Sequence, residues 1–281
     1  MSRRLTERFV AGPTLEDGIR VLHDLSRQRI TGTLDFLGEN VTSLDEAAQS
    51  RDSYLAALCA IRSSQLPATV SIKLTQFGLD FSQDACLENV IQLVERARKM
   101  DSRVEIDMES SEYTDRTIAI VSRLQERFPG SVRAVIQAYL FRSEADIRAL
   151  SERQIPVRLC KGAYSEPPTV AFPRKEDVDS NYVKLMKLLL DSGTYPAIAS
   201  HDESIVAEAL RHVKEQNVAR DRFEFQMLYG IRRDLQRKLV GEQYRLRLYV
   251  PYGDAWYPYF MRRLAERPAN VVFLAKNLLR N

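Results

Sequence analysis

The segment VRAVIQAYLFRSEADIRALSERQIPVRLCKGAY, residues 132–164, contains one complete strand–helix–strand unit. Residues 132–140 and 157–161 are short runs of mostly apolar, partly β-branched residues, and residues 144–153 carry apolar side chains at helical spacing. A helix between two short apolar strands is typical of a parallel sheet. This unit therefore predicts an α/β fold.

The same alternation repeats along the whole chain. Eight strands that alternate with eight helices are typical of a (βα)8 barrel of the TIM type. The rival is an open doubly wound sheet, but no G-x-G-x-x-G follows any strand, so a Rossmann dinucleotide site has no support. The predicted strands are 30–37, 68–74, 103–108, 132–140, 157–161, 197–200, 222–228 and 245–250, and the predicted helices are 44–62, 83–99, 112–127, 144–153, 177–192, 203–216, 232–241 and 256–279.

A further helix is predicted ahead of the first strand. Thr14 is its expected N-cap, with Asp17 three residues later as in a capping box. No Pro/Ser-rich linker, low-complexity tract or shift in composition divides the chain. We therefore expect one barrel domain over residues 1–281, with residues 1–29 as an N-terminal helical extension.

Composition excludes several classes of protein. The 281 residues are 44% hydrophobic and 28% charged, which excludes a disordered chain and a coiled coil. The formal charge of only +3 argues against a dedicated nucleic-acid binder. The apolar stretch Tyr54–Ile61 is too short to span a bilayer, and the N-terminus does not read as a signal peptide. A cytoplasmic protein without disulfides is expected, because no C-x-x-C pair occurs among Cys59, Cys86 and Cys160.

Polar and charged residues gather where the predicted strands end, which is where barrel enzymes carry their active sites. Unpaired charge inside a barrel is costly, so these groups pair with one another or with a ligand. Ion pairs of the barrel core are the structural alternative for any one of them. The residues in question are Lys73, Asp107, Glu109, Gln137, Tyr139, Arg158, Lys161, Ser200, His201, Asp202, Glu224, Gln226 and Tyr249.

Two other chemistries can be weighed from these residues. His201 and Asp202 make a metal site conceivable, but no second histidine lies at ligand spacing, so no dedicated metal is expected. Lys161 in an apolar strand could have the lowered pKa of a Schiff-base lysine. An aldolase-type barrel that uses Lys161 or Lys73 therefore stays open as an alternative. A third hypothesis is a barrel that binds carboxylates without catalysis.

The last predicted helix contains Tyr259 followed by Arg262 and Arg263. The tyrosine and the arginines share one helix face because they are three and four residues apart. Two guanidinium groups can hold one carboxylate through several charge-assisted hydrogen bonds. The aromatic run around Tyr259 could then close over a small apolar ring.

These motifs together resemble the proline dehydrogenase family over about residues 30–279. The resemblance implies a distorted (βα)8 TIM-like barrel with the final helix above the barrel and with non-covalent FAD over the carboxyl ends of the strands. It implies oxidation of L-proline to Δ1-pyrroline-5-carboxylate, the first step of proline catabolism, by hydride transfer to FAD and reoxidation by a membrane quinone. The matching segments are TLDFLGE (33–39), SIKLTQFGLD (71–80), DMES (107–110), IQAYL (136–140), RLCKGAY (158–164), SHD (200–202), FEFQMLYG (223–230) and YVPYGDAWYPYFMRRLAERPANV (249–271).

For the substrate, the resemblance implies a site built from strand ends and the last helix. Arg262 and Arg263 resemble the pair that binds the proline carboxylate. Lys73 resembles the lysine that pairs with this carboxylate, and Asp107 resembles the acidic residue that orients it. The residues that match those around the proline ring are Leu228, Tyr249 and Tyr259, with Tyr164 as a further tyrosine of the site.

For the flavin, Arg158 resembles the arginine near N5, and Met108 and Gln137 match residues that flank the isoalloxazine. Glu39 resembles the acidic residue that pairs with Arg262 and gates access. The further positions expected to contact FAD are Lys161, Gly162, Ala163, Ser200 and His201. The candidate catalytic residues are Lys73, Asp107, Arg158 and Tyr249.

The chain departs from the family at a few positions. Ser200 stands where threonine is commoner, Cys160 where an aliphatic residue is usual, and Ser165 where some members have tryptophan. The DNA-binding and aldehyde dehydrogenase regions of the large bifunctional relatives are not found, so a monofunctional bacterial type is expected. The expected partners are L-proline and a membrane quinone. The protein would reach the quinone by peripheral contact at the inner face of the plasma membrane. The sequence does not decide between a monomer and a homo-oligomer.

Overall fold

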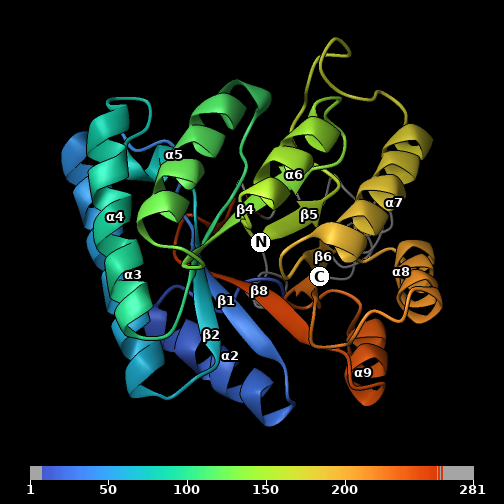
Figure 1. The fold of residues 1–281 in the computed structure, drawn as a ribbon. Coiled ribbons are helices and arrows are strands. Elements are labelled where there is room, and N and C mark those ends of the chain that lie inside the picture. Colours follow the sequence, from blue (N-terminus) through green and yellow to red (C-terminus); the bar gives the residue numbers. More distant parts are fainter. Residues whose placement is uncertain (1–7, 258, 260, 262–281) are drawn as a thin grey trace, which may run out of the picture.

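The computed structural model describes residues 8–257, 259 and 261. Its strands form one closed barrel in which each strand pairs in parallel with the next and β8 pairs with β1 (Figure 1). The strands are β1 Thr31–Phe36, β2 Ala68–Ile72, β3 Val104–Ile106, β4 Val132–Gln137, β5 Val157–Cys160, β6 Ala197–Ala199, β7 Glu224–Leu228 and β8 Leu246–Tyr252. The predicted (βα)8 barrel is confirmed.

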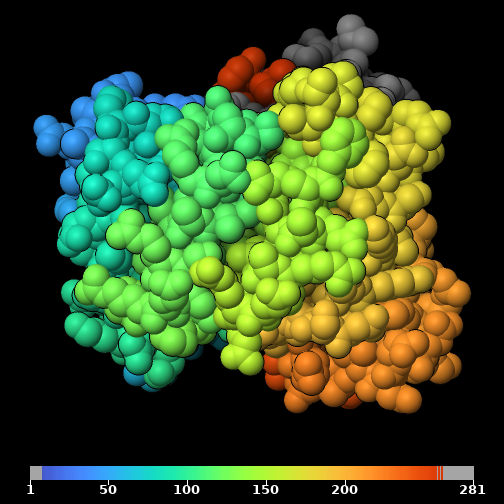
Figure 2. All heavy atoms as spheres, turned by 45° about the horizontal axis from the view of Figure 1, so that its top comes forward, coloured from blue at the N-terminus to red at the C-terminus, as the bar shows by residue number. Residues whose placement is uncertain are grey.

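Helices surround this barrel and follow one another around it in chain order (Figure 1). Figure 2 shows the same chain order on one face of the molecule, as neighbouring areas of colour from blue through green and yellow to orange. They include the predicted helix that precedes β1. The predicted helix 256–279 lies largely outside the described residues. The helices are α2 Leu15–Arg27, α3 Leu44–Ser63, α4 Gln83–Lys99, α5 Thr114–Arg127, α6 Ser143–Glu152, α7 Lys175–Ser192, α8 Glu203–Glu215 and α9 Arg233–Gly241, with short 3-10 turns η1 Leu74–Phe77 and η2 Ser111–Tyr113.

Local sequence explains where several helices begin. Thr14 and Asp17 form the predicted capping box of α2, in which each side chain bonds the other residue's backbone N–H. Ser43 and Ser82 cap α3 and α4, and Asp202 caps α8, each by accepting a hydrogen bond from a first-turn backbone N–H. Such caps satisfy N–H groups that have no partner within the helix.

The β4 strand ends earlier than predicted. The apolar run suggests a strand over 132–140, but the barrel strand stops at Gln137. The N–H groups of Ala138 and Tyr139 still donate to the carbonyls of Cys160 and Lys161, while Leu140 pairs with Ala171 in an isolated antiparallel bridge. Residues 138–140 therefore leave the barrel wall to hold the long segment between β5 and α7.

The barrel interior is unusually rich in charge. Parallel strands buried on both faces are normally near-continuous apolar runs, and every residue of β2, β3 and β4 is indeed buried. Ionisable side chains nevertheless occupy buried positions within or directly after six of the strands. These are Asp35, Lys73, Glu105, Arg133, Arg158 and Glu224.

Candidate active site

Four side chains converge on the carboxylate of Asp107, which directly follows β3. The hydroxyl groups of Tyr249 and Ser71 donate to its two oxygens at 2.7 Å and 2.8 Å. The guanidinium of Arg158 also donates to it, and the ammonium of Lys73 lies 3.6 Å away. The four candidate catalytic residues are therefore brought together, because Lys73, Arg158 and Tyr249 each contact Asp107. Lys73 and Asp107 directly follow β2 and β3, and Arg158 and Tyr249 lie within β5 and β8.

The ammonium of Lys73 lies between two carboxylates. Its Nζ donates to Asp35 Oδ1 at 3.0 Å and to the Tyr249 hydroxyl at 3.3 Å. Burial alone would favour the neutral amine, but the carboxylates of Asp35 and Asp107 outweigh it and raise the pKa of Lys73. A Schiff-base lysine needs a neutral amine, so this environment argues against that role for Lys73.

Arg158 connects this cluster to the centre of the barrel. Its Nη1 lies 3.3 Å from Glu105 Oε2 and donates to Gln226 Oε1 at 3.3 Å, while Nη2 bonds Asp107. Its guanidinium carbon also lies 5.3 Å from the centre of the Tyr249 ring. Its Nε is buried without a hydrogen-bond partner among the described residues. Arg158 therefore has one donor left for a ligand.

The protonation states follow from these contacts. Burial would raise the pKa of Asp107, but Arg158 and Lys73 outweigh burial and lower it, so the carboxylate stays charged near neutral pH. Burial and the neighbouring Asp107 raise the pKa of Tyr249 well above its ordinary value. The phenol therefore keeps its proton and acts as a hydrogen-bond donor.

A second charged group lies at the ends of β5 and β6. Lys161 Nζ donates to Asp202 at 2.9 Å and to Asp179 of α7. Burial opposes ionisation of Asp202, but hydrogen bonds from Ser204 and Lys161 outweigh it and lower the pKa of Asp202. Lys161 is thus held as part of an ion-pair cluster at the rim, not in the apolar pocket that a Schiff-base lysine needs.

Beside these two clusters lie small and amide groups, which we call the cradle and which include Gly162 and Gln137. Gly162 has φ +119°, and a Cβ added to it would lie 2.4 Å from the ring of Tyr139, so a side chain cannot be accepted there without strain. Gln137 donates through Nε2 to the Met108 carbonyl at 2.6 Å, while its Oε1 is buried without a partner among the described residues. The cradle therefore offers an unused acceptor.

The β6 and β7 ends are joined by His201. The backbone N–H of Leu228 donates to His201 Nε2 at 2.8 Å, so this nitrogen carries no proton. Ser200 accepts a hydrogen bond from the Asp202 N–H at 3.1 Å. Within the described ranges, no group of three His, Cys, Asp or Glu side chains is placed to hold a metal ion.

An aromatic cap lies beside the central cluster. Tyr259 is buried and packs with Val10 and Leu37, and Tyr249 and Trp256 pack against them. Tyr259 and Tyr249 are thus brought together as expected. Arg262 and Arg263 lie outside the described residues. The remaining predicted positions, Glu39, Ala163 and Tyr164, lie in segments that follow β1 and β5 at the same end of the barrel.

Sequence reasoning missed several partners of the predicted residues. Asp35, Ser71 and Glu105 were not singled out, although each contacts a candidate catalytic group. For Ser71 and Glu105 the available signal is spacing, because each lies two residues before a candidate catalytic residue and residues two apart in a strand point to the same side. The pairs that share the barrel interior in this way are Ser71 and Lys73, Glu105 and Asp107, Glu224 and Gln226, and Arg247 and Tyr249.

Comparison with known proteins supports the resemblance. Residues 19–276 match the proline dehydrogenase family. The chain is 42% identical over 273 residues to proline dehydrogenase 1 of Bacillus subtilis, covering 97% of this chain and 90% of that protein. It is 40% identical over 280 residues to proline dehydrogenase of Deinococcus radiodurans, covering 98% and 90%.

A solved structure has the same fold. The crystal structure of proline utilization A from Bdellovibrio bacteriovorus, inactivated by N-propargylglycine, aligns with a TM-score of 0.86 and 26% identity over 92% of this chain. The aligned region is 32% of that longer chain, so this protein corresponds to about a third of it.

Proposed function

The chain belongs to the proline dehydrogenase family, and we propose from this membership that it oxidises L-proline to Δ1-pyrroline-5-carboxylate with non-covalent FAD as the hydride acceptor. The observation that carries the proposal is the convergence of Lys73, Arg158 and Tyr249 on Asp107 at the carboxyl end of the barrel. This end is where barrel enzymes bind their substrates.

The residues present fit a flavin. A planar ring with both hydrogen-bond donors and acceptors would find two unused groups here, the Nε of Arg158 and the Oε1 of Gln137. We propose that the backbone at Gly162 and the ammonium of Lys161, which Asp202 holds at 2.9 Å, contact the cofactor. Bound FAD would accept the hydride that leaves the proline ring carbon beside the nitrogen.

For substrate binding, we propose that Lys73 holds the proline carboxylate together with Arg262 and Arg263. A fixed carboxylate orients the ring, which is the largest contribution a protein makes to such a reaction. Asp107 would hold Lys73 in place, since it lies 3.6 Å from Nζ. Positive charge around the substrate also favours the neutral amine from which a hydride can leave.

The ring of the substrate would be enclosed by Leu228, Tyr249 and Tyr259. Tyr249 is fixed by its hydrogen bond to Asp107, and Tyr259 is fixed by packing on Val10. These groups would exclude water and keep the reacting carbon in one position. Glu39 and Arg262 are proposed to gate access to this space.

We further propose that an apolar quinone reoxidises the cofactor through peripheral contact with a membrane. The large hydrophobic side chains that are exposed among the described residues all lie in segments that follow strands, at the same end of the barrel as the site. They are Leu44, Phe81, Phe141, Tyr257 and Met261. No described helix is long and apolar enough to cross a bilayer.

The proposal is tested with the full chain reconstituted with FAD. L-proline should reduce a water-soluble quinone analogue. Mass spectrometry should detect one Δ1-pyrroline-5-carboxylate for each quinone reduced. Because the Bdellovibrio protein is inactivated by N-propargylglycine, the same compound should abolish this turnover. Proline binding without any turnover would instead favour a carboxylate-binding barrel, and borohydride trapping of a lysine adduct would favour the Schiff-base alternative.

A further inference from the structure

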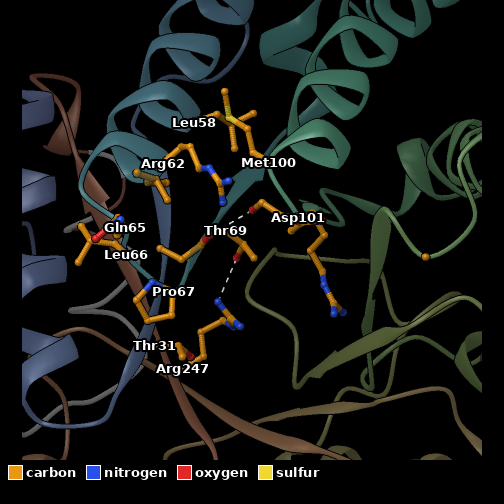
Figure 3. A pocket seen from close by; sticks show the side chains of 15 residues that line it. Thr31, Leu58, Arg62, Gln65, Leu66, Pro67, Thr69, Met100, Asp101 and Arg247 are labelled. Carbon is orange, nitrogen blue, oxygen red and sulfur yellow. Dashed lines mark hydrogen bonds between the residues drawn. The ribbon is translucent and has the colours of Figure 1, made fainter.

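A cavity lies at the opposite end of the barrel from the proposed active site, and Figure 3 shows the side chains that line it. Its volume is about 810 Å³. Thr31 and Ala68, which line it, are the first residues of β1 and β2, and Arg247 is the second residue of β8. The cavity is therefore at the amino ends of the strands, which we call the barrel floor.

The floor cavity is lined by three arginines. Arg62 and Arg103 form no ion pair within the described part of the chain, whereas Arg247 lies 3.0 Å from Glu224. Asp101 is the one acidic side chain among the described lining residues. The lining thus has an excess of positive charge, which concentrates anions in a cleft.

Arg103 is the least compensated of the three. Its Nη1 is buried without a hydrogen-bond partner among the described residues. Its guanidinium carbon lies 5.4 Å from the centre of the Tyr195 ring. Burial and the neighbouring cations of Arg133 and Arg247 outweigh the carboxylates of Glu105 and Glu224 and lower the pKa of Arg103. A buried guanidinium donor without an acceptor is costly, and an anion would relieve this cost.

The helix dipole explains only part of this charge. Arg62 is in the last turn of α3, where a cation is favoured by the carbonyl groups at the helix end. Arg103 and Arg247 are not on helices but at the amino ends of β3 and β8. Glu224 accounts for Arg247, so Arg62 and Arg103 are the lining arginines that have no ion pair among the described residues.

The rest of the lining adds shape and selectivity. Figure 3 shows Arg62, Thr69 and Arg247 around one space, with a hydrogen bond of 3.3 Å from Arg247 to the Thr69 hydroxyl. Leu58, Leu66, Pro67 and Met100 form an apolar wall beside them. Such a combination suits a compact organic or inorganic oxyanion, held by guanidinium groups through paired hydrogen bonds.

We propose that the barrel floor is a binding site for a small multivalent oxyanion, carboxylate or phosphate in type. The site is separate from the proline site, so it does not depend on the proposed function. Arg62 and Arg103 bind the anion, and Arg247, already paired with Glu224, completes the cationic wall.

The test is isothermal titration of the full chain with citrate and with pyrophosphate at constant ionic strength. We expect saturable binding at one site. Tighter binding of citrate indicates a carboxylate ligand, and tighter binding of pyrophosphate indicates a phosphate ligand. The variant Arg62→Gln/Arg103→Gln should weaken binding about tenfold or more. Arg62→Gln alone, at an exposed position of α3, should weaken it measurably in a chain whose fold is not in question.

Two controls separate this site from other sources of binding. Arg123→Gln/Arg233→Gln removes the same charge from exposed positions of α5 and α9 and should leave the affinity unchanged. Lys73→Met removes a cation of the proposed active site and should also leave it unchanged. The proposal is overturned if neither probe binds saturably, if the surface control weakens binding equally, or if binding is lost with Lys73 and kept without Arg62 and Arg103.

Discussion

Replacing Lys73 by methionine tests how the charges at the barrel mouth depend on one another. Methionine is similar in length, so the main change is loss of the ammonium. Asp35, which is 0% exposed and 3.0 Å from Nζ, then loses its only described cationic partner. Removing one member of a buried ion pair costs about 3–5 kcal/mol. We expect Lys73→Met to lower the free energy of unfolding by about this amount at pH 8.

The loss of stability should depend on pH, because protonation neutralises the buried carboxylate of Asp35. Burial already raises the pKa of Asp35, and without Lys73 only a hydrogen bond with Tyr249 opposes burial and the nearby charge of Asp107 among its described neighbours. A carboxyl whose folded pKa is raised binds protons more tightly in the folded state, so stability falls as pH rises above its unfolded pKa of about 4. Lys73→Met should therefore be less destabilised at pH 5 than at pH 8.

The double variant Asp35→Asn/Lys73→Met separates structure from function. Asparagine carries no charge, so this variant should regain most of the lost stability and lose the pH dependence between pH 5 and 8. It should not regain affinity for proline, because Lys73 is proposed to bind the substrate carboxylate. Urea unfolding at both pH values and the KM for proline are the measurements. A loss below about 1 kcal/mol that is independent of pH would refute the reasoning.

Three further variants probe other parts of the site. Tyr249→Phe removes one hydrogen bond to the carboxylate of Asp107 and should lower kcat/KM about tenfold. FAD should stay bound, as measured by visible absorbance. An unchanged kcat/KM would show that the Tyr249 hydroxyl has no role in the reaction. Lys161→Ala should change the free energy of unfolding by less than about 1 kcal/mol but weaken FAD retention on gel filtration about tenfold or more, and full occupancy would contradict its cofactor role. Gly162→Ala should lower FAD affinity and stability by about 1–3 kcal/mol, since its Cβ would meet the Tyr139 ring at 2.4 Å. Gly241→Ala, where a Cβ meets nothing within 4 Å, is the control. Equal effects of the two changes would refute the role proposed for Gly162 in binding FAD.

Much of the fold is encoded in short-range patterns. The apolar run 157–161 predicts strand β5, which the structure has at Val157–Cys160, because a short apolar run between helical segments has few other interpretations. The end of β4 was placed three residues late, since residues 138–140 continue the apolar run. Contacts with a segment distant in sequence, such as the bridge between Leu140 and Ala171, show that the chain has left the barrel.

The site was predictable in its members but not in its pairing. Lys73, Asp107 and Tyr249 follow or end apolar strands, and the family resemblance points to the same positions. The pairing depends on barrel closure and strand register. These bring Lys73 to Asp35, and they bring Tyr249 to Asp107, which is 142 residues away in the sequence. The cavity at the barrel floor is also a product of closure, because its lining comes from β1, β2 and β8 and from the ends of α3 and α4.

We propose that this barrel uses bound FAD to oxidise L-proline. The most direct measurement is the visible spectrum of the FAD-reconstituted protein under anaerobic conditions, before and after addition of L-proline. We expect the absorbance of the bound flavin to bleach when L-proline is added, and Δ1-pyrroline-5-carboxylate to form in an amount equimolar with the flavin. A protein that retains FAD but whose spectrum does not change at saturating L-proline would contradict it.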